Sequence, residues 1–176
     1  MSKQTLFSIL IFLQLLQMSC NDSNQSLKNT TMNKLALKIE VEKKAFTVND
    51  TIFIKATLIN QSPDMVLINN RFLIGYEEQD DREIYFKIFS ANGKRYDLPK
   101  DHQTDILPLA PTKTNMQQLA PSANIKSDIE LTLLNQFKEP GKYKVVGVYE
   151  SKPFENTQGV YQTPVCSDTL EIEILK

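Results

Sequence analysis

A run of alternating apolar and polar residues from Leu35 to Val41 constrains the fold more than any other feature of this sequence. A period of two places one face of an extended strand on a core and the other face in water. The pattern returns between turn residues along the rest of the chain. The predicted strands cover residues 35–41, 51–59, 65–68, 83–89, 94–98, 125–134, 143–150 and 169–175. About seven or eight short strands predict an all-β fold, an antiparallel β-sandwich of two packed sheets.

The segments between the predicted strands carry turn residues rather than helical patterns. Asn92-Gly93 favours a tight hairpin turn, because both residues tolerate positive φ. No segment repeats apolar residues at helical spacing, and residues 117–120 are expected to form a helical turn at most. The long connection 96–124 contains four prolines. Two interpretations of it remain open, a short edge strand near 105–109 or a binding loop.

The residues before the predicted strands have the features of an export signal. Lys3 supplies a positive charge, and the apolar run 6–16 that follows is shorter than the roughly 20 residues that span a bilayer. A small residue, Ser19, then stands directly before Cys20. This arrangement resembles the lipobox of bacterial lipoproteins, in which the cysteine is lipidated and becomes the first residue of the mature chain. The alternatives are an ordinary cleaved signal peptide and a disulfide bridge between Cys20 and Cys166.

Three regions follow from this interpretation. Residues 1–19 are a lipoprotein signal peptide, 20–34 are the lipidated cysteine with a flexible tether, and 35–176 are one folded domain. The tether is rich in Asn, Ser and Thr and contains too little apolar surface to fold alone. The diacyl or triacyl cysteine of this class, palmitate included, is expected to anchor the chain firmly, and Cys166 is then expected to stand alone. Asn21 replaces the aspartate that usually signals retention at the inner membrane, which favours an outer-membrane location in the cell envelope.

Several short motifs in the predicted domain are similar to those of bacterial immunoglobulin-like envelope domains. They are residues 45–52 followed by 56–62, residues 119–123, the Pro-Gly-x-Tyr-x-Val pattern of 140–145 that resembles the start of a hairpin, and 159–161 with Ser167. The resemblance implies an immunoglobulin-like sandwich over 35–176. It implies no single function, since such sandwiches serve in adhesion, polymer binding, protease inhibition and assembly.

Composition and motifs argue against most catalytic and nucleic-acid functions. The formal net charge of −1 gives no basic surface of the kind that nucleic acid requires. The one histidine, His102, cannot build a multi-histidine zinc site, and no Gly-x-Ser-x-Gly elbow accompanies it. The acidic run 77–81 lacks the spacing of a calcium loop and is interpreted as a solvated turn, with calcium as the alternative. We therefore expect no catalytic residue, no metal and no cofactor.

The connection 151–167 is the first candidate for a binding loop, because it displays the aromatic residues Phe154 and Tyr161. The alternative is that both side chains pin the loop against the rim of the sandwich. A second candidate surface comprises apolar residues on outward faces of the predicted strands. These residues are Phe53, Ile59, Val146 and Val148.

The sequence thus predicts a membrane-anchored lipoprotein of the cell envelope with a non-catalytic binding or accessory role. Its expected partners are the membrane, through the lipid anchor, and an envelope protein or a glycan. One alternative is an inhibitor that blocks a protease or another hydrolase with a loop. A second alternative is an enzyme that acts on a polysaccharide through carboxylates such as Asp80 and Asp81. Adjacent acids on a strand point in opposite directions, which argues against that enzyme.

Overall fold

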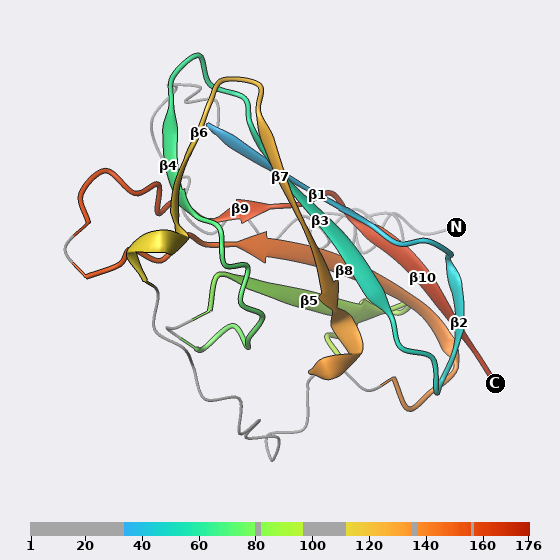
Figure 1. Ribbon diagram of the computed structural model, residues 1–176. Coiled ribbons are helices and arrows are strands. Elements are labelled where there is room, and N and C mark those ends of the chain that lie inside the picture. The colour runs from blue at the N-terminus through green and yellow to red at the C-terminus, as the bar shows by residue number, and fades with distance from the viewer. Residues whose placement is uncertain (1–33, 80–81, 97–111, 135–136, 156) are drawn as a thin grey trace, which may run out of the picture. The chain divides into compact units, whose positions relative to one another are not determined.

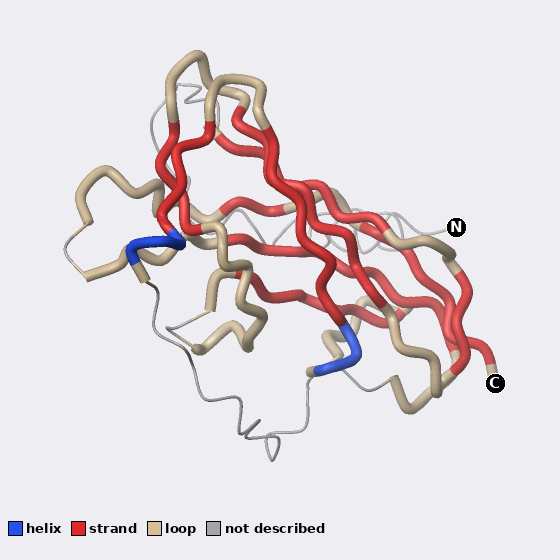
Figure 2. The backbone as a smooth tube through the Cα atoms, viewed as in Figure 1, coloured by secondary structure: helices blue, strands red, loops and turns tan. Residues whose placement is uncertain are grey.

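The computed structural model describes residues 34–79, 82–96, 112–134, 137–155 and 157–176. Over these residues the chain forms ten strands and two short 3-10 helices, which confirms the all-β class (Figures 1 and 2). The strands are β1 Leu35–Glu40, β2 Ala45–Thr47, β3 Phe53–Asn60, β4 Val66–Asn69, β5 Ile84–Ser90, β6 Met116–Leu119, β7 Asn124–Glu130, β8 Gly141–Tyr149, β9 Val165–Cys166 and β10 Leu170–Leu175. The 3-10 helices are η2 Lys113–Asn115 and η3 Leu131–Leu133. No helix in the described ranges is long and apolar enough to cross a bilayer.

Two sheets form the sandwich, and their strand order is that of an immunoglobulin fold. The first sheet has the order β1-β3-β7, and the second has the order β2-β10-β8-β5 with β9 attached to β8. In the immunoglobulin fold the first, second, fourth and fifth main strands share one sheet, and the third, sixth and seventh share the other. Here β1, β3 and β7 take the first, second and fifth positions, and β5, β8 and β10 take the third, sixth and seventh. The strand before β7, β6, pairs with β4 instead of with β7. The expected immunoglobulin-like sandwich is therefore confirmed.

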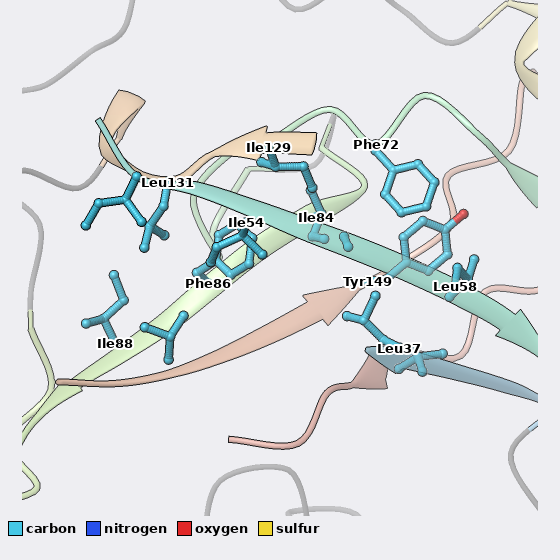
Figure 3. Packing of buried hydrophobic residues seen from close by; sticks show 14 of the residues in the cluster. Leu37, Ile54, Leu58, Phe72, Ile84, Phe86, Ile88, Ile129, Leu131 and Tyr149 are labelled. Carbon is cyan, nitrogen blue, oxygen red and sulfur yellow. The ribbon is translucent and has the colours of Figure 1, made fainter. Parts of the chain in front are cut away.

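Alternate residues of the two sheets meet in one apolar core. Figure 3 shows Ile54 and Leu58 of β3 on one side of this core and Phe86 and Ile88 of β5 on the other. Each of the four side chains is buried. Burying one such aliphatic side chain contributes roughly 1.5–3 kcal/mol. The alternation that predicted the strands thus also predicted which of their faces form the core.

The Pro-Gly-x-Tyr segment forms a corner between the two sheets, so the predicted hairpin at this point is wrong. It connects β7 of the first sheet to β8 of the second. The hydroxyl of Tyr143 donates a hydrogen bond of 2.8 Å to the carbonyl oxygen of Glu139. A tyrosine near the start of the sixth main strand that bonds back to the upstream backbone is typical of immunoglobulin-like domains. The ring of Tyr143 also packs edge-on against Phe137, with centroids 4.9 Å apart.

Other local predictions are confirmed or corrected by the structure. The turn at Asn92-Gly93 is confirmed, with Gly93 at φ +79° and a hydrogen bond from Ser90 N to Lys94 O. The predicted helical turn at 117–120 is wrong, because residues 116–119 form strand β6. The predicted strand 125–134 ends at Glu130 and continues as η3. The proposed edge strand at 105–109 lies outside the described residues.

Candidate functional site

Three long connections meet at one end of the sandwich and form a small sheet of their own. Strand β4 belongs to the connection that joins β3 to β5 along the chain. It pairs with β6, which belongs to the connection that leads into β7. The connection from β8 to β10 joins the free side of β4 through a bridge between Leu67 and Val160. Tyr161 N donates a hydrogen bond of 2.9 Å to Leu67 O. We call β4, β6 and the described residues of 151–161, which are 151–155 and 157–161, the loop end. The connections β3–β5 and β8–β10 correspond to two of the three loops that form the recognition site of immunoglobulin variable domains.

Asn60 fixes the first of these connections where it leaves β3. Its side chain is fully buried. The amide nitrogen donates to the carbonyl oxygens of Asp64 at 2.7 Å and Leu119 at 2.8 Å. The amide oxygen accepts hydrogen bonds from Ser62 N and Ser62 Oγ. One amide therefore joins the turn after β3 to the strand before β7.

A buried ion pair holds the middle of the loop end. The carboxylate of Glu83 is fully buried and receives Arg71 Nε at 2.9 Å and Arg71 Nη2 at 2.6 Å. Leu73 N and Asn69 Nδ2 also donate to this carboxylate, each at 3.0 Å. A buried carboxylate is tolerated only when it is paired and hydrogen-bonded, and four donors satisfy Glu83.

Asn69 and Tyr149 connect this ion pair to the connection after β8. Asn69 N donates to Ser151 Oγ at 2.7 Å, and Asn69 Nδ2 donates to Lys152 O at 3.0 Å. The hydroxyl of Tyr149 donates to Asn69 O. Burial raises the pKa of Tyr149 far above its usual value, so the phenol stays protonated and remains a donor. The start of the 151–161 segment is therefore held rigidly against the sandwich.

A cavity of about 410 Å³ opens at the side of the loop end. It is lined by Lys113, Met116, Phe154, Glu155 and Thr157. Phe154 and Met116 are half-buried, whereas Lys113 and Glu155 are exposed. Thr157 N and Thr157 Oγ1 both donate to Phe154 O, which fixes the turn that carries the ring. This combination of an aromatic ring, a thioether and two opposite charges suits a ligand with an apolar body and polar groups.

The structure separates the two aromatic residues that the sequence placed on one binding loop. Phe154 lines the cavity. Tyr161 packs against the hydrophobic core and supports the bridge to β4. For Tyr161 the geometry matches the alternative in which the side chain pins the loop.

Lys113 and Met116 complete the cavity, and no sequence pattern marks either of them as a site residue. They reach Phe154 only because β6 pairs with β4 and Val160 bridges to the other side of β4. A proline-bearing connection carries no local pattern that reveals such long-range pairing. The pairing register between distant segments places these residues together, and a local sequence pattern does not reveal that register.

The other sequence candidates lie elsewhere or outside the described residues. Glu77 binds Lys87 at 3.0 Å and Arg95 at 2.5 Å. Burial alone would raise the pKa of Glu77, but these two hydrogen-bonded cations hold it below its usual value. In the described part of the chain, no three acidic, histidine or cysteine side chains are grouped as metal ligands. Asp80, Asp81 and His102 lie outside the described residues.

The apolar residues on outward faces do not form one surface. Phe53 is 54% exposed, Ile59 and Val146 are half-buried, and Val148 is buried. Phe53 and Ile59 belong to the first sheet, whereas the two valines belong to the second. The second candidate surface is therefore divided between the two sides of the sandwich.

Cys166 of β9 takes part in a disulfide bond, so the expectation that it stands alone is wrong. The chain has one other cysteine, Cys20, which lies outside the described residues. A lipid thioether on Cys20 and a disulfide through the same sulfur exclude each other, because both use its single bond beyond Cβ. The chemical state of Cys20 therefore decides whether the chain is a lipoprotein or a protein with a disulfide between Cys20 and Cys166.

Comparisons with known proteins add no functional assignment. No family model matches the chain, and no curated protein matches it. Among solved structures, the alkylpurine DNA glycosylase AlkC of Pseudomonas fluorescens, bound to DNA that contains an abasic site analog, is similar at TM-score 0.38 and 11% identity, over 81% of this chain and 31% of that chain. The β-glucosidase EmGH1 of Erythrobacter marinus is similar at TM-score 0.37 and 8% identity, over 80% of this chain and 15% of that chain. The chain spans less than a third of either enzyme, and neither likeness supports a shared activity.

Proposed function

We propose that this protein is a lipid-anchored binding module of the bacterial cell envelope. In the proposed mature protein, the sulfur of Cys20 carries the lipid that holds the domain in the outer membrane, so Cys20 is not bonded to Cys166. The cavity beside Phe154 receives an envelope protein or a glycan. The role is non-catalytic. The observation that carries the binding role is the placement of Phe154 beside a cavity on a loop fixed by hydrogen bonds and by the bridge to β4.

The construction of the loop end supports recognition rather than passive connection. A fixed loop loses little conformational entropy when a ligand binds, which favours affinity. Aromatic side chains at the mouth of a pocket are frequent anchors in protein interfaces. The membrane part of the proposal is supported by Ser19-Cys20 at the end of the apolar run.

Photo-crosslinking from defined positions in cells tests the binding site. A benzophenone amino acid at position 154 is expected to capture a discrete envelope partner, whereas the same residue at position 53 is expected to capture none. Phe53 is the matched control, because it is also an accessible phenylalanine but lies at the far end of β3. Equal capture from both positions, or none from 154, would contradict the assignment.

The identity of the captured partner distinguishes the functional alternatives. A protease or another hydrolase that loses activity on binding would support the inhibitor function. An envelope protein that keeps its activity would support an accessory role. Glycan attached to position 154 would assign the cavity to a polysaccharide.

Mass spectrometry of the N-terminal peptide tests the anchor. A mature chain that begins at a lipidated Cys20 supports the proposal. A peptide in which Cys20 is bonded to Cys166 excludes the thioether and would replace the lipoprotein with a secreted, disulfide-bonded protein. Cys166→Ser is the matched control, since it removes the disulfide and leaves lipidation unaffected.

A further inference from the structure

Two turns lie together where β3 ends and β7 begins, and we call them the tip. The first turn is residues 61–65, and the second is residues 120–123. Ser122 N donates to Asn60 O and Asn60 N donates to Ala123 O, each at 3.0 Å. The side chain of Asn60 also bonds both Asp64 and Leu119. The two turns therefore form one fixed surface.

The tip is exposed, and four of its seven exposed residues are apolar; the other three are Gln61, Asp64 and Ser122. Its exposed apolar residues are Pro63, Met65, Ala120 and Pro121. Met65 is 54% exposed, although it directly precedes the buried first residue of β4. Asp64 is the one charged side chain of the two turns. Exposed apolar residues that are grouped in this way are typical of a surface that contacts a protein or a membrane.

The outer face of the first sheet changes in character with distance from the tip. The row next to the tip is uncharged and consists of Ala36, Ile59 and Asn124. The next row has Lys38 and Lys126 on either side of Thr57, with no acid. The row beyond it contains two acids, Glu40 and Asp128, beside Lys55. The lysine row is four residues from Gln61 along β3 and three residues from Ala123 along β7. At about 3.3 Å per residue it lies roughly 10–13 Å from the tip.

The chain enters the domain at the tip. Gln61 N donates to Lys34 O at 2.8 Å, so the last residue of the predicted tether is bonded to the first turn. The predicted tether runs from Cys20 to Lys34, and a flexible chain of that length reaches roughly 20 Å. A domain held this closely at its tip presents the tip to the surface that holds the tether.

We propose that the tip and its lysine row contact the bilayer in which the chain is anchored, with the lysines at anionic lipid headgroups. This inference rests on the proposed lipid anchor. Apolar side chains that enter an interface while lysines reach its headgroups form a common arrangement in peripheral membrane proteins. The tether raises the local concentration of the bilayer, so a surface too weak to bind from solution is sufficient here.

The contact leaves the cavity open. The tip adjoins the Val66–Leu119 end of the small sheet, whereas Met116 of the cavity pairs with Asn69 at its other end. The two surfaces are thus separated by the length of β4. A ligand of the cavity would be met beside the membrane rather than beneath the domain.

The absence of tryptophan from the chain allows a direct test. Met65→Trp and Phe53→Trp each introduce one fluorophore at a site that is 54% exposed, and the sites lie at opposite ends of β3. The mature lipidated proteins are reconstituted in vesicles of phosphatidylethanolamine and phosphatidylglycerol with brominated acyl chains. The tryptophan at position 65 is expected to shift to the blue and to lose about half its emission, as for a side chain roughly 5–10 Å into the interface. The tryptophan at position 53 is expected to keep the emission it has without vesicles.

Charge reversal tests the lysine row. Lys38→Glu with Lys126→Glu, added to Met65→Trp, is expected to remove most of the quenching in these anionic vesicles. Lys142→Glu with Lys144→Glu makes the same change of net charge on the second sheet and is expected to remove little. Equal losses from the two pairs would assign the effect to net charge and overturn the role of the row.

The failures of the two proposals are distinguishable in one preparation. Mass spectrometry first establishes the lipid on Cys20, and circular dichroism establishes the fold of each variant. A chain without lipid overturns the anchor and this inference with it. A lipidated, folded chain in which positions 65 and 53 are quenched equally, or in which position 65 is not quenched, overturns the membrane contact alone.

Discussion

The interior between the two sheets and the loop end each have a buried centre, yet different kinds of side chain hold them. The interior consists of aliphatic and aromatic residues such as Ile54 and Leu58. The loop end is organised around the buried polar residues Asn60, Asn69 and Glu83. Apolar burial depends on the area removed from water and has little directional requirement. A buried amide or carboxylate stabilises the fold only when its hydrogen bonds are made, so the conformation of the loop end depends on individual hydrogen bonds.

Removing Arg71 is expected to have the largest effect on stability. Arg71→Leu leaves the Glu83 carboxylate fully buried without its cation, and breaking such a pair costs about 3–5 kcal/mol. The free energy of unfolding from urea titration measures the loss. Arg71→Leu combined with Glu83→Leu is expected to recover most of it, because no buried charge remains. A single variant as stable as the parent would show that the pair does not hold the loop end.

Truncating Leu58 tests the apolar side of the comparison. Leu58→Ala is expected to destabilise the domain by about 2–5 kcal/mol, because it leaves a cavity between the sheets. The loss is expected to be global, so amide hydrogen exchange should accelerate together in β3, β8 and β10. Acceleration confined to the loop end would contradict the division between the two regions.

Asn60→Ala is expected to cost less and to act locally. It leaves the carbonyl oxygens of Asp64 and Leu119 without their donor, a loss of about 1–3 kcal/mol. Hydrogen exchange should accelerate in the tip before it does so in the sheets. Asn124→Ala, at an exposed position of β7, is the control and is expected to change stability by less than about 0.5 kcal/mol.

Glu77→Gln is expected to have the smallest effect and the clearest pH signature. The folded pKa of Glu77 lies below its ordinary value of 4.5, so the carboxylate stabilises the fold above that pH. This stabilisation is lost as the pH falls through the folded pKa. Because the pair is partly exposed, we expect less than about 1 kcal/mol. The variant should show a flatter dependence of unfolding free energy on pH below 4.5; an unchanged slope would argue against these ion pairs.

The same contrast explains what the sequence could predict of the fold. Alternation gave β3, β8 and β10 within a few residues, because a half-buried strand records its burial in its own sequence. Alternation did not predict the strand at residues 116–119, because this segment is a strand through its pairing with β4 and has no alternating pattern of its own. The alternating pattern places Glu83 at the start of a predicted strand. No local pattern shows that its carboxylate is buried against Arg71, which lies in the segment between β4 and β5.

The candidate site was predictable only in part for the same reason. Phe154 stood out as an aromatic residue in a long connection. Lys113 and Met116 did not, because they join Phe154 through the register of distant segments. The hydrogen-bonded pairing of distant strands places these side chains together, and no short stretch of sequence shows which strands will pair.

The parallel pairing of β2 with β10 has a consequence for the order in which this domain can fold. Phe46 is paired with Ile174, and β10 also separates β2 from β8. Pairing between distant segments forms slowly, because a long loop must close before any contact rewards it. A chain that leaves a ribosome or an export channel N-terminus first therefore has a gap in its larger sheet until residues 170–175 emerge. Until then β2 has no neighbouring strand to pair with, so the larger sheet, and with it the domain, cannot be completed.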